Sequence, residues 1–336
     1  MITSGFSRRQ ALQWIGLGAA APFFLRARSL WAAEAVKGDG VARLKLAGSE
    51  ARILATTDLH FFSKTLLDNP RTLRELRNLA RRFGPDLMLL NGDVWYNNPH
   101  GRGERHCAWL CEQMATLGVP WAFARGNHDL ADDFSACERR LTAAPHSLYA
   151  GEGSNSNYRV ELLNAQGRVG WRIIVVNDAA PEMGFREAQV EWLKAEAARI
   201  RREPEPEAPA LLFCHVPLAA FAELVRQGAA RGTMKEKVSF EGGLSEALAA
   251  IGESGFIRAV FCGHDHLNNF RGELDGIHLE YLRATGFGGY GNLRLKKGAT
   301  LITLPLDRPE KSFQTRTVLA DGEEIELEEK PALIER

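Results

Sequence analysis

The sequence predicts an α/β fold in which two facing mixed β-sheets form a β-sandwich flanked by α-helices. Two observations support this prediction: short apolar runs alternate with helical periodicity along the body of the chain, and the C-terminal half is rich in strands. The chain has 336 residues, of which 45% are hydrophobic and 25% are charged, so it can bury a substantial core. We expect one domain over residues 36–336, without a second domain or an internal repeat.

Elements of the first half are predicted from apolar runs and from helical spacing. Residues 51–56 form an apolar strand, and arginines and leucines at helical spacing across residues 70–83 predict a helix that Gly84-Pro85 stops. The continuous apolar run 86–90 is typical of a buried strand. Next we expect a loop that becomes a helix over residues 99–118, a strand over 119–124 and a short helix over 131–142.

The second half begins with a predicted hairpin. Residues 158–163 and 171–176 would pair around the turn Asn164-Ala165-Gln166-Gly167, and residues 186–202 form an amphipathic helix. Residues 218–255 have helix and loop character without a recognisable chemical motif. Further strands are expected over residues 210–214, 257–262, 274–282, 299–304, 312–318 and 323–327.

Charge and cysteine content narrow the classes of partner. Forty-two basic residues balance forty-two acidic ones, so we expect neither nucleic acid nor an anionic membrane surface as a partner. Five cysteines cannot all pair, and Cys107 and Cys111 lie on one helical face, where the backbone resists a disulfide. Cys214 and Cys262 are expected in the core, and a disulfide that involves Cys137 stays open.

The first 35 residues resemble a twin-arginine export signal. Arg8-Arg9 precedes the apolar stretch 11–25, and small residues follow at Ala32, Ala33 and Ala35. We therefore expect cleavage near Ala35, recognition by the twin-arginine export machinery, and a periplasmic or secreted protein. The apolar stretch is about five residues shorter than the roughly 20 that span a bilayer, so no stable membrane span is expected. The alternative, an amphipathic helix packed on the body, conflicts with a stretch that is apolar nearly all round.

Five predicted strands end in residues that can bind a metal ion. A lone histidine or Asp-x-His pair is more often structural, but five such strand ends together predict a metal centre. Seven nitrogen or oxygen ligands suit two divalent ions that share a carboxylate, and the mixed donors favour Fe, Zn or Mn. The seven candidate ligands are Asp58, His60, Asp93, Asn127, His215, His264 and His266.

A second candidate metal site is weaker. His106, Cys107 and Cys111 lie close together on the helix expected within residues 99–118. A surface histidine beside two core cysteines explains the same pattern, and we favour that interpretation. The turn Gly286-Phe287-Gly288-Gly289-Tyr290-Gly291 is not a phosphate loop, because no helix follows it. Its two aromatic side chains are expected to line a substrate entrance.

In order and form, the five motifs resemble those of the calcineurin-like metallophosphoesterase superfamily over residues 50–305. Residues 263–270, together with the turn 288–291, resemble a branch of small purple-acid-phosphatase-like proteins. The resemblance implies the calcineurin-like phosphoesterase fold. It also implies that Asp93 bridges two metal sites, one completed by Asp58, His60 and His266, the other by Asn127, His215 and His264.

The resemblance implies a reaction as well. A metal-bridging hydroxide would attack a small phosphate ester directly, without a phosphoenzyme. His128 would protonate the leaving alkoxide, Asp129 would orient His128, and Asp265 would support the neighbouring histidines. We predict a phosphomonoesterase. The alternatives are a phosphodiesterase with the same metal centre and a noncatalytic metal- or phosphate-binding protein on the same scaffold.

Further residues near these motifs are candidates for lining the site or for contacting phosphate. Gly92-Asp93-Val94-Trp95-Tyr96 resembles the motif of true purple acid phosphatases, in which the tyrosine binds ferric iron. Because His60 is also present, we expect His60 to take that position and Tyr96 to form a wall. Three polar side chains are candidates either for phosphate contact or for surface ion pairs, and the second role is favoured for the last of them. They are Arg125, Asn268 and Arg271.

Overall fold

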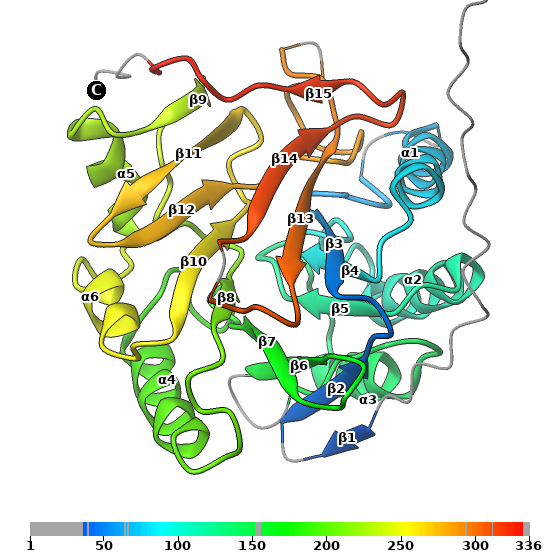
Figure 1. Cartoon of the computed structure of the whole chain (residues 1–336). Coiled ribbons are helices and arrows are strands. Elements are labelled where there is room, and N and C mark those ends of the chain that lie inside the picture. Colours follow the sequence, from blue (N-terminus) through cyan, green and yellow to red (C-terminus); the bar gives the residue numbers. More distant parts are fainter. Residues whose placement is uncertain are drawn as a thin grey trace, which may run out of the picture. The chain divides into compact units, whose positions relative to one another are not determined.

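A computed structural model of the chain (Figure 1) describes residues 36–38, 40–63, 65, 67–151, 156–292, 294–310 and 312–331. All of them belong to one compact unit that spans Ala33–Arg336. The predicted export signal, residues 1–35, lies outside the described residues. None of the helices in the described ranges is both long enough and apolar enough to cross a bilayer.

One of the two sheets has nine strands and mixes parallel and antiparallel pairs. β7 and β8, β8 and β10, and β10 and β12 pair in parallel, whereas β6 and β7 form the predicted antiparallel hairpin. The strand order is β1 (Val36–Gly38), β2 (Val41–Lys45), β6 (Tyr158–Leu163), β7 (Val169–Val175), β8 (Ala210–Phe213), β10 (Ile257–Cys262), β12 (Ile277–Tyr281), β11 (Asn268–Leu274) and β9 (Arg231–Met234).

The other sheet has six strands. Its strands β3, β4 and β5 are parallel, so their carboxyl ends meet at one edge, and β4 and β5 are buried along their whole length. An antiparallel group from the end of the chain extends this sheet on the other side. The strand order is β15 (Glu324–Ile325), β14 (Gln314–Val318), β13 (Ala299–Pro305), β3 (Glu50–Thr56), β4 (Leu87–Asn91) and β5 (Trp121–Ala124).

Helices cover the outer side of each sheet (Figure 1). α1 (Asp68–Phe83), α2 (Gly103–Leu117) and α3 (Phe134–Ala143) contribute to the larger hydrophobic core with the six-stranded sheet. α4 (Glu187–Ile200), α5 (Ala219–Arg226) and α6 (Ala247–Gly252) pack with β8, β10 and β12 in a second core. The predicted β-sandwich flanked by helices is therefore confirmed.

Several details of the predicted secondary structure are wrong. β1 and β2 precede residues 51–56, which were expected to form the first strand. The strand expected over residues 274–282 is one arm of a hairpin, because Asp275 (φ 51°) and Gly276 (φ 75°) turn the chain between β11 and β12. β9 was not predicted at all. It pairs with β11 through Gly232, where a β-carbon would lie 2.4 Å from the Asn269 carbonyl oxygen, and such a short strand has no apolar alternation.

The interpretation of the helix that carries His106 also needs correction. His106 is buried rather than exposed, because its ring stacks on Phe62 with centroids 4.1 Å apart. Phe62 comes from a separate segment, so the sequence of the helix alone does not reveal this contact. All five cysteines are buried and free, and no cluster of metal-ligating side chains within the described ranges includes His106 or Cys107.

Candidate metal centre

The five predicted motifs meet at one edge of the sandwich because each follows a strand that ends there. The six-stranded sheet delivers three of them, after β3, β4 and β5, and the nine-stranded sheet delivers two, after β8 and β10. Backbone hydrogen bonds fix the first two to each other: the Asp58 amide donates to the Gly92 carbonyl at 3.1 Å, and the His60 amide donates to the Asp93 carbonyl at 2.9 Å.

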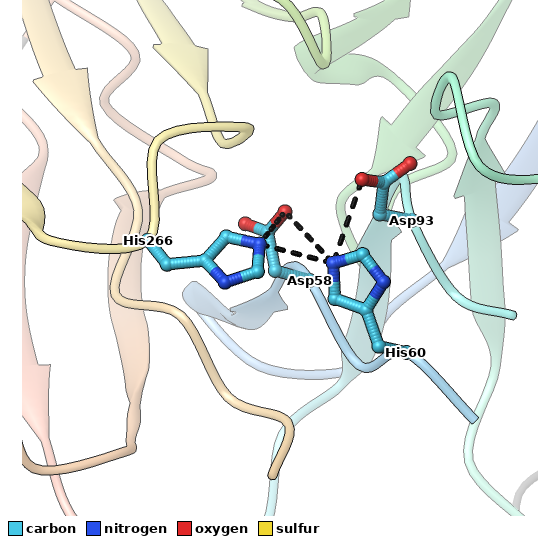
Figure 2. Close-up of side chains that lie close together, drawn as sticks. All are labelled: Asp58, His60, Asp93 and His266. Carbon is cyan, nitrogen blue, oxygen red and sulfur yellow. Dashed lines mark hydrogen bonds and ion pairs between the residues drawn. The ribbon is translucent and has the colours of Figure 1, made fainter. Parts of the chain in front are cut away.

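Four side chains from three of these motifs converge in a first cluster (Figure 2). His60 Nε2 lies 3.0 Å from His266 Nε2 and 3.5 Å from Asp93 Oδ2, and His266 Nε2 lies 3.2 Å from Asp58 Oδ1. All four residues are buried, and their potential ligand atoms lie within 4.8 Å of one another. Two imidazole nitrogens and two carboxylates facing one point form a cation site.

A second cluster shares Asp93 with the first. Asp93, His215 and His264 place their potential ligand atoms within 4.8 Å of one another, and His215 Nε2 lies 3.3 Å from Asp93 Oδ2. Asn127 belongs to the same wall, because its neighbours on both sides touch Asp93: the His128 amide donates to Asp93 Oδ1 at 2.8 Å, and Gly126 packs on the Asp93 backbone.

Unsatisfied polar atoms indicate that metal ions fit both clusters. Asp58 Oδ1, Asn127 Oδ1 and His215 Nε2 are buried and make no hydrogen bond within the described residues. Buried polar atoms are normally paired, so each of these atoms is exceptional in an ordinary core. Imidazole nitrogens with carboxylate and amide oxygens form a donor set that suits Fe, Zn or Mn.

The backbone of the candidate ligands is strained. Asp58 (φ 54°), His60 (φ 46°), Asp93 (φ 51°) and His264 (φ 73°) all adopt the left-handed conformation that non-glycine residues rarely occupy. Each such residue costs about 1–3 kcal/mol, and such strain concentrates at functional sites. Gly92 is required beside them, because a β-carbon there would lie 2.3 Å from His215 Nδ1.

The electrostatics of the clusters favour ionised carboxylates. Burial would raise the pKa of Asp58, but the nearby histidines, His266 foremost, together outweigh burial, and the pKa lies well below the usual range. Burial would also raise the pKa of Asp93, but neighbouring histidines, His215 first among them, lower it. Burial lowers the pKa of His60 to about 3, so its imidazole is neutral, the form that a metal ion requires. Burial also opposes the charge on His215, yet Asp93 raises its pKa to about 10.

His128 lies beside the clusters, and Asn97 rather than Asp129 orients it. His128 Nδ1 lies 2.8 Å from Asn97 Oδ1, while His128 Nε2 points toward Asp93 Oδ2 at 4.0 Å. Tyr96 stacks on the other side of the His128 ring, with centroids 4.8 Å apart. The side chain of His128 is 32% exposed, so it can reach a substrate.

Asp129 has a structural role instead of the predicted one. Its carboxylate accepts hydrogen bonds from the backbone amides of Val94, Trp95 and Gly126 at 2.8–2.9 Å. It therefore joins the loop after β4 to the loop after β5. Burial, followed by the nearby Asp93 charge, raises the pKa of Asp129 to about 7. The prediction that Asp129 aims His128 fails because backbone donors competed for the carboxylate.

Asp265 supports the neighbouring histidines by holding their loop rather than by contact with their rings. Asp265 Oδ2 accepts hydrogen bonds from the Ser239 amide at 3.0 Å and from the Tyr281 hydroxyl at 2.6 Å, rather than from a neighbouring histidine. It therefore fixes the loop that carries His264 and His266 to β12. Tyr96 lines the pocket over the clusters, as expected of a wall residue, and its ring centroid lies 5.6 Å from that of His60.

Arg125, Asn268 and Arg271, the three polar residues that flank the motifs, do not line the pocket that opens over the two clusters. Arg125 packs its guanidinium over the Phe134 ring at 3.4 Å, and Asn268 Oδ1 accepts the amides of Lys235 and Glu236. Arg271 donates to Thr315 and lies 3.8 Å from Glu328, so the favoured surface ion pair is present.

A small pocket of about 220 Å³ opens over the two clusters. No described lysine or arginine lines it. Tyr290 is the one aromatic of the turn 286–291 that does, and Phe287 instead packs under Arg71. The lining residues are His60, Asp93, Tyr96, His128, Ser239, His264, Asp265, His266, Gly288, Gly289 and Tyr290.

Several contacts around the clusters were not predicted. Glu241 Oε1 lies 3.3 Å from His264 Nε2, and Glu236 contacts Tyr290 at the pocket rim. Both glutamates belong to the segment between β9 and α6, which showed no chemical motif. Asn97 was missed for the same reason. Their roles depend on tertiary contacts that no local pattern records.

The fold and the two clusters agree with the comparison to known families. The calcineurin-like phosphoesterase family matches residues 51–268, well over half of the chain, and the chain belongs to this family. A relative from Arabidopsis thaliana, called probable inactive purple acid phosphatase 29, is 26% identical in an alignment 305 positions long that covers 78% of this chain and 78% of the relative. The predicted superfamily and its purple-acid-phosphatase-like branch are thereby confirmed.

Solved structures share the fold at low sequence identity. A dimetal phosphatase from Danio rerio superimposes with a TM-score of 0.55 at 14% identity, covering 83% of this chain and 98% of that one. A purple acid phosphatase from yellow lupin (Lupinus luteus) seeds superimposes with a TM-score of 0.52 at 13% identity, covering 83% of this chain and 53% of that one. These likenesses establish the architecture of two sheets and flanking helices.

Proposed function

We propose that this chain is a binuclear metal-dependent phosphoesterase that hydrolyses small phosphate monoesters. The observation that carries the proposal is the pair of buried clusters that share Asp93 and open, beside His128, into one pocket. Membership of the calcineurin-like phosphoesterase family supports a phosphate ester as the substrate. The donor set favours Fe, Zn or Mn in both positions.

The proposed ligands divide between two ions. Asp58, His60 and His266 would hold one ion, Asn127, His215 and His264 the other, and Asp93 would contribute to both. Two bound metal ions supply Lewis-acid activation of water and neutralise charge on the phosphate oxygens. The buried carboxylates and the imidazoles of the chain would orient these ions.

His128 would handle the proton of the leaving group. Its Nε2 faces the pocket, and its Nδ1 is held by Asn97 at 2.8 Å, so the ring has a fixed direction. A positioned histidine can give a proton to a departing alkoxide, which is a poor leaving group when it leaves unprotonated. Tyr96 limits the movement of the ring by stacking on it.

Matched aryl esters test the proposal. We expect the metal-loaded protein to hydrolyse p-nitrophenyl phosphate with a higher kcat/KM than bis(p-nitrophenyl) phosphate, measured by release of p-nitrophenolate. The same protein after chelation serves as the control and should be inactive on both. Full metal occupancy with no hydrolysis of either ester would refute the enzymatic proposal and would favour a noncatalytic binding protein; the Arabidopsis relative is itself named as probably inactive.

A phosphodiesterase is the second candidate, and one observation favours it. Among the residues that the structure describes, no lysine or arginine lines the pocket, so none of these side chains supplies a cation for the second negative charge of a monoester. A higher kcat/KM for the diester would select this alternative while leaving the metal centre unchanged.

We also propose that residues 1–35 are an export signal. The arginine pair and the apolar stretch that follows it support recognition by the twin-arginine machinery and a periplasmic or secreted location. Fusion of residues 1–40 to a reporter should move the reporter out of the bacterial cytoplasm. Arg8→Lys combined with Arg9→Lys provides the control and should keep it inside. Cytoplasmic retention of the unaltered fusion would contradict the proposal.

A further inference from the structure

The turn 286–291 lies directly against the first cluster. A β-carbon at Gly289 would lie 2.3 Å from His266 Cε1 and 3.0 Å from His60 Cδ2, so only glycine allows the backbone to pack on both rings. At Gly288 a β-carbon would lie 2.0 Å from the His60 carbonyl oxygen. The backbone of the turn thus packs directly against two candidate metal ligands, His60 and His266.

Tyr290, the next residue, contacts His266 in three ways. The two rings stack with centroids 4.1 Å apart and an interplanar angle of 12°. The His266 backbone amide donates to the Tyr290 hydroxyl at 3.3 Å, and His266 Nδ1 lies 3.4 Å from the Tyr290 carbonyl oxygen. Donation from Nδ1–H to this carbonyl leaves Nε2 with a free lone pair, and Nε2 is the atom that faces Asp58 and His60.

Two remote segments hold Tyr290 in this position. Its hydroxyl donates to Glu236 Oε2 at 2.8 Å, while Glu236 Oε1 accepts the amide of Leu267, the residue after His266, at 2.5 Å. Its carbonyl oxygen also accepts a hydrogen bond from Lys297 Nζ at 3.3 Å, and Lys297 is 6% exposed. The ring and the carbonyl of Tyr290 are therefore both anchored independently of His266.

We propose that Tyr290 is a positioning residue for the first metal site: its side chain, held by Glu236, fixes the direction of the His266 ring, while its backbone carbonyl, which substitution keeps, sets the tautomer. This inference rests on the proposed function in one respect, since it assumes that the cluster binds a metal ion. Residues that orient a metal-ligating histidine through its second nitrogen commonly change metal affinity by about 10–100-fold when they are replaced.

Metal affinity, measured without substrate, tests the proposal. The full chain is titrated with Zn²⁺ in competition with a chromophoric chelator, which gives a dissociation constant for each of two equivalents. In Tyr290→Leu, which removes the stack and the hydroxyl, we expect one equivalent to bind about 10–100-fold more weakly and the other to stay near its wild-type constant. Tyr290→Phe keeps the stack and should show a smaller loss in the same equivalent.

The matched control is Phe287→Leu, an aromatic-to-leucine change on the same turn. Phe287 packs under Arg71, 3.8 Å from the guanidinium carbon, and does not line the pocket. Both constants should therefore match those of the wild type. Circular dichroism and thermal melting establish that each variant is folded, and the near-isosteric Tyr290→Phe provides the test if Tyr290→Leu unfolds.

The possible outcomes separate this inference from the proposed function. If the wild type binds two equivalents and the Tyr290 variants bind both with unchanged constants, the positioning role is refuted while the metal centre stands. A raised KM for aryl phosphates with unchanged metal constants would also refute it and would make Tyr290 a substrate contact. A wild-type chain that binds no Zn²⁺ would overturn both proposals.

Discussion

Asp93→Ala is expected to lose both metal ions and to reduce phosphate-ester hydrolysis to the uncatalysed level. Asp93 is the one residue that belongs to both clusters, with Oδ2 3.5 Å from His60 Nε2 and 3.3 Å from His215 Nε2. Without it, each site loses an anionic ligand: the first keeps Asp58 as its one carboxylate, and the second keeps no carboxylate, so both bind a divalent ion more weakly. Metal content by elemental analysis after dialysis, together with turnover of p-nitrophenyl phosphate, measures both effects.

His264→Ala is the appropriate comparison for Asp93→Ala, because His264 belongs to the second cluster alone. It should lose one ion and keep the other. Asp93→Asn adds a further distinction, since it keeps the shape of the side chain and removes the charge. Retention of one ion at wild-type affinity by Asp93→Ala would show that the two sites do not share this carboxylate.

The second large effect is expected for His128→Ala, which should keep both ions and lose turnover. A general acid typically contributes about 10²–10⁴-fold in rate, so we expect a fall in kcat of that order with an alkyl phosphate. The loss should be much smaller with p-nitrophenyl phosphate, because p-nitrophenolate departs without a proton. Steady-state kinetics with both esters, combined with metal analysis, measures the contrast.

The pH dependence of this effect has a definite sign. Burial lowers the pKa of His128 from its usual 6.5, despite the opposing influence of Asp93. The protonated donor is therefore populated only on the acidic side of that value, and the difference between the wild type and His128→Ala should widen as pH falls, within the range where the ions stay bound. Asn97→Ala, which frees His128 Nδ1, should reproduce part of the loss. Unchanged turnover of an alkyl phosphate by His128→Ala would exclude the proton-donor role.

Much of the fold follows from local patterns. The strands β3, β4, β5, β8 and β10 are mainly apolar, and each ends at a cluster of polar residues, so both their positions and the edge where they meet are predictable. β9 is different. It owes its pairing to Gly232 and to the neighbouring β11, and neither leaves a periodic pattern in the sequence.

The candidate ligands were predictable, whereas the groups around them were not. Residues such as Asp58 and His266 stand in short motifs after strands, and the structure brings the predicted histidines and carboxylates into the two clusters. Asn97 and Glu241 reach the site from loops, and their hydrogen bonds depend on tertiary placement. Asp129 was expected to orient His128 because the two residues are adjacent in the sequence. The actual partners of the Asp129 carboxylate are backbone amides, whose positions cannot be predicted from the sequence.

The origin of the ligands has a mechanical consequence for the whole sandwich. Asp58, Asp93 and Asn127 follow strands of the six-stranded sheet, whereas the ligands that start at His215 follow strands of the nine-stranded sheet. Ions bound at both clusters would tie one sheet to the other, in the manner of a reversible cross-link. Because the ions would bind only the folded chain, they would stabilise it by mass action. Chelation would thus loosen the seam between the sheets as well as remove the chemistry, and the strained left-handed turns at that seam would be the first to relax.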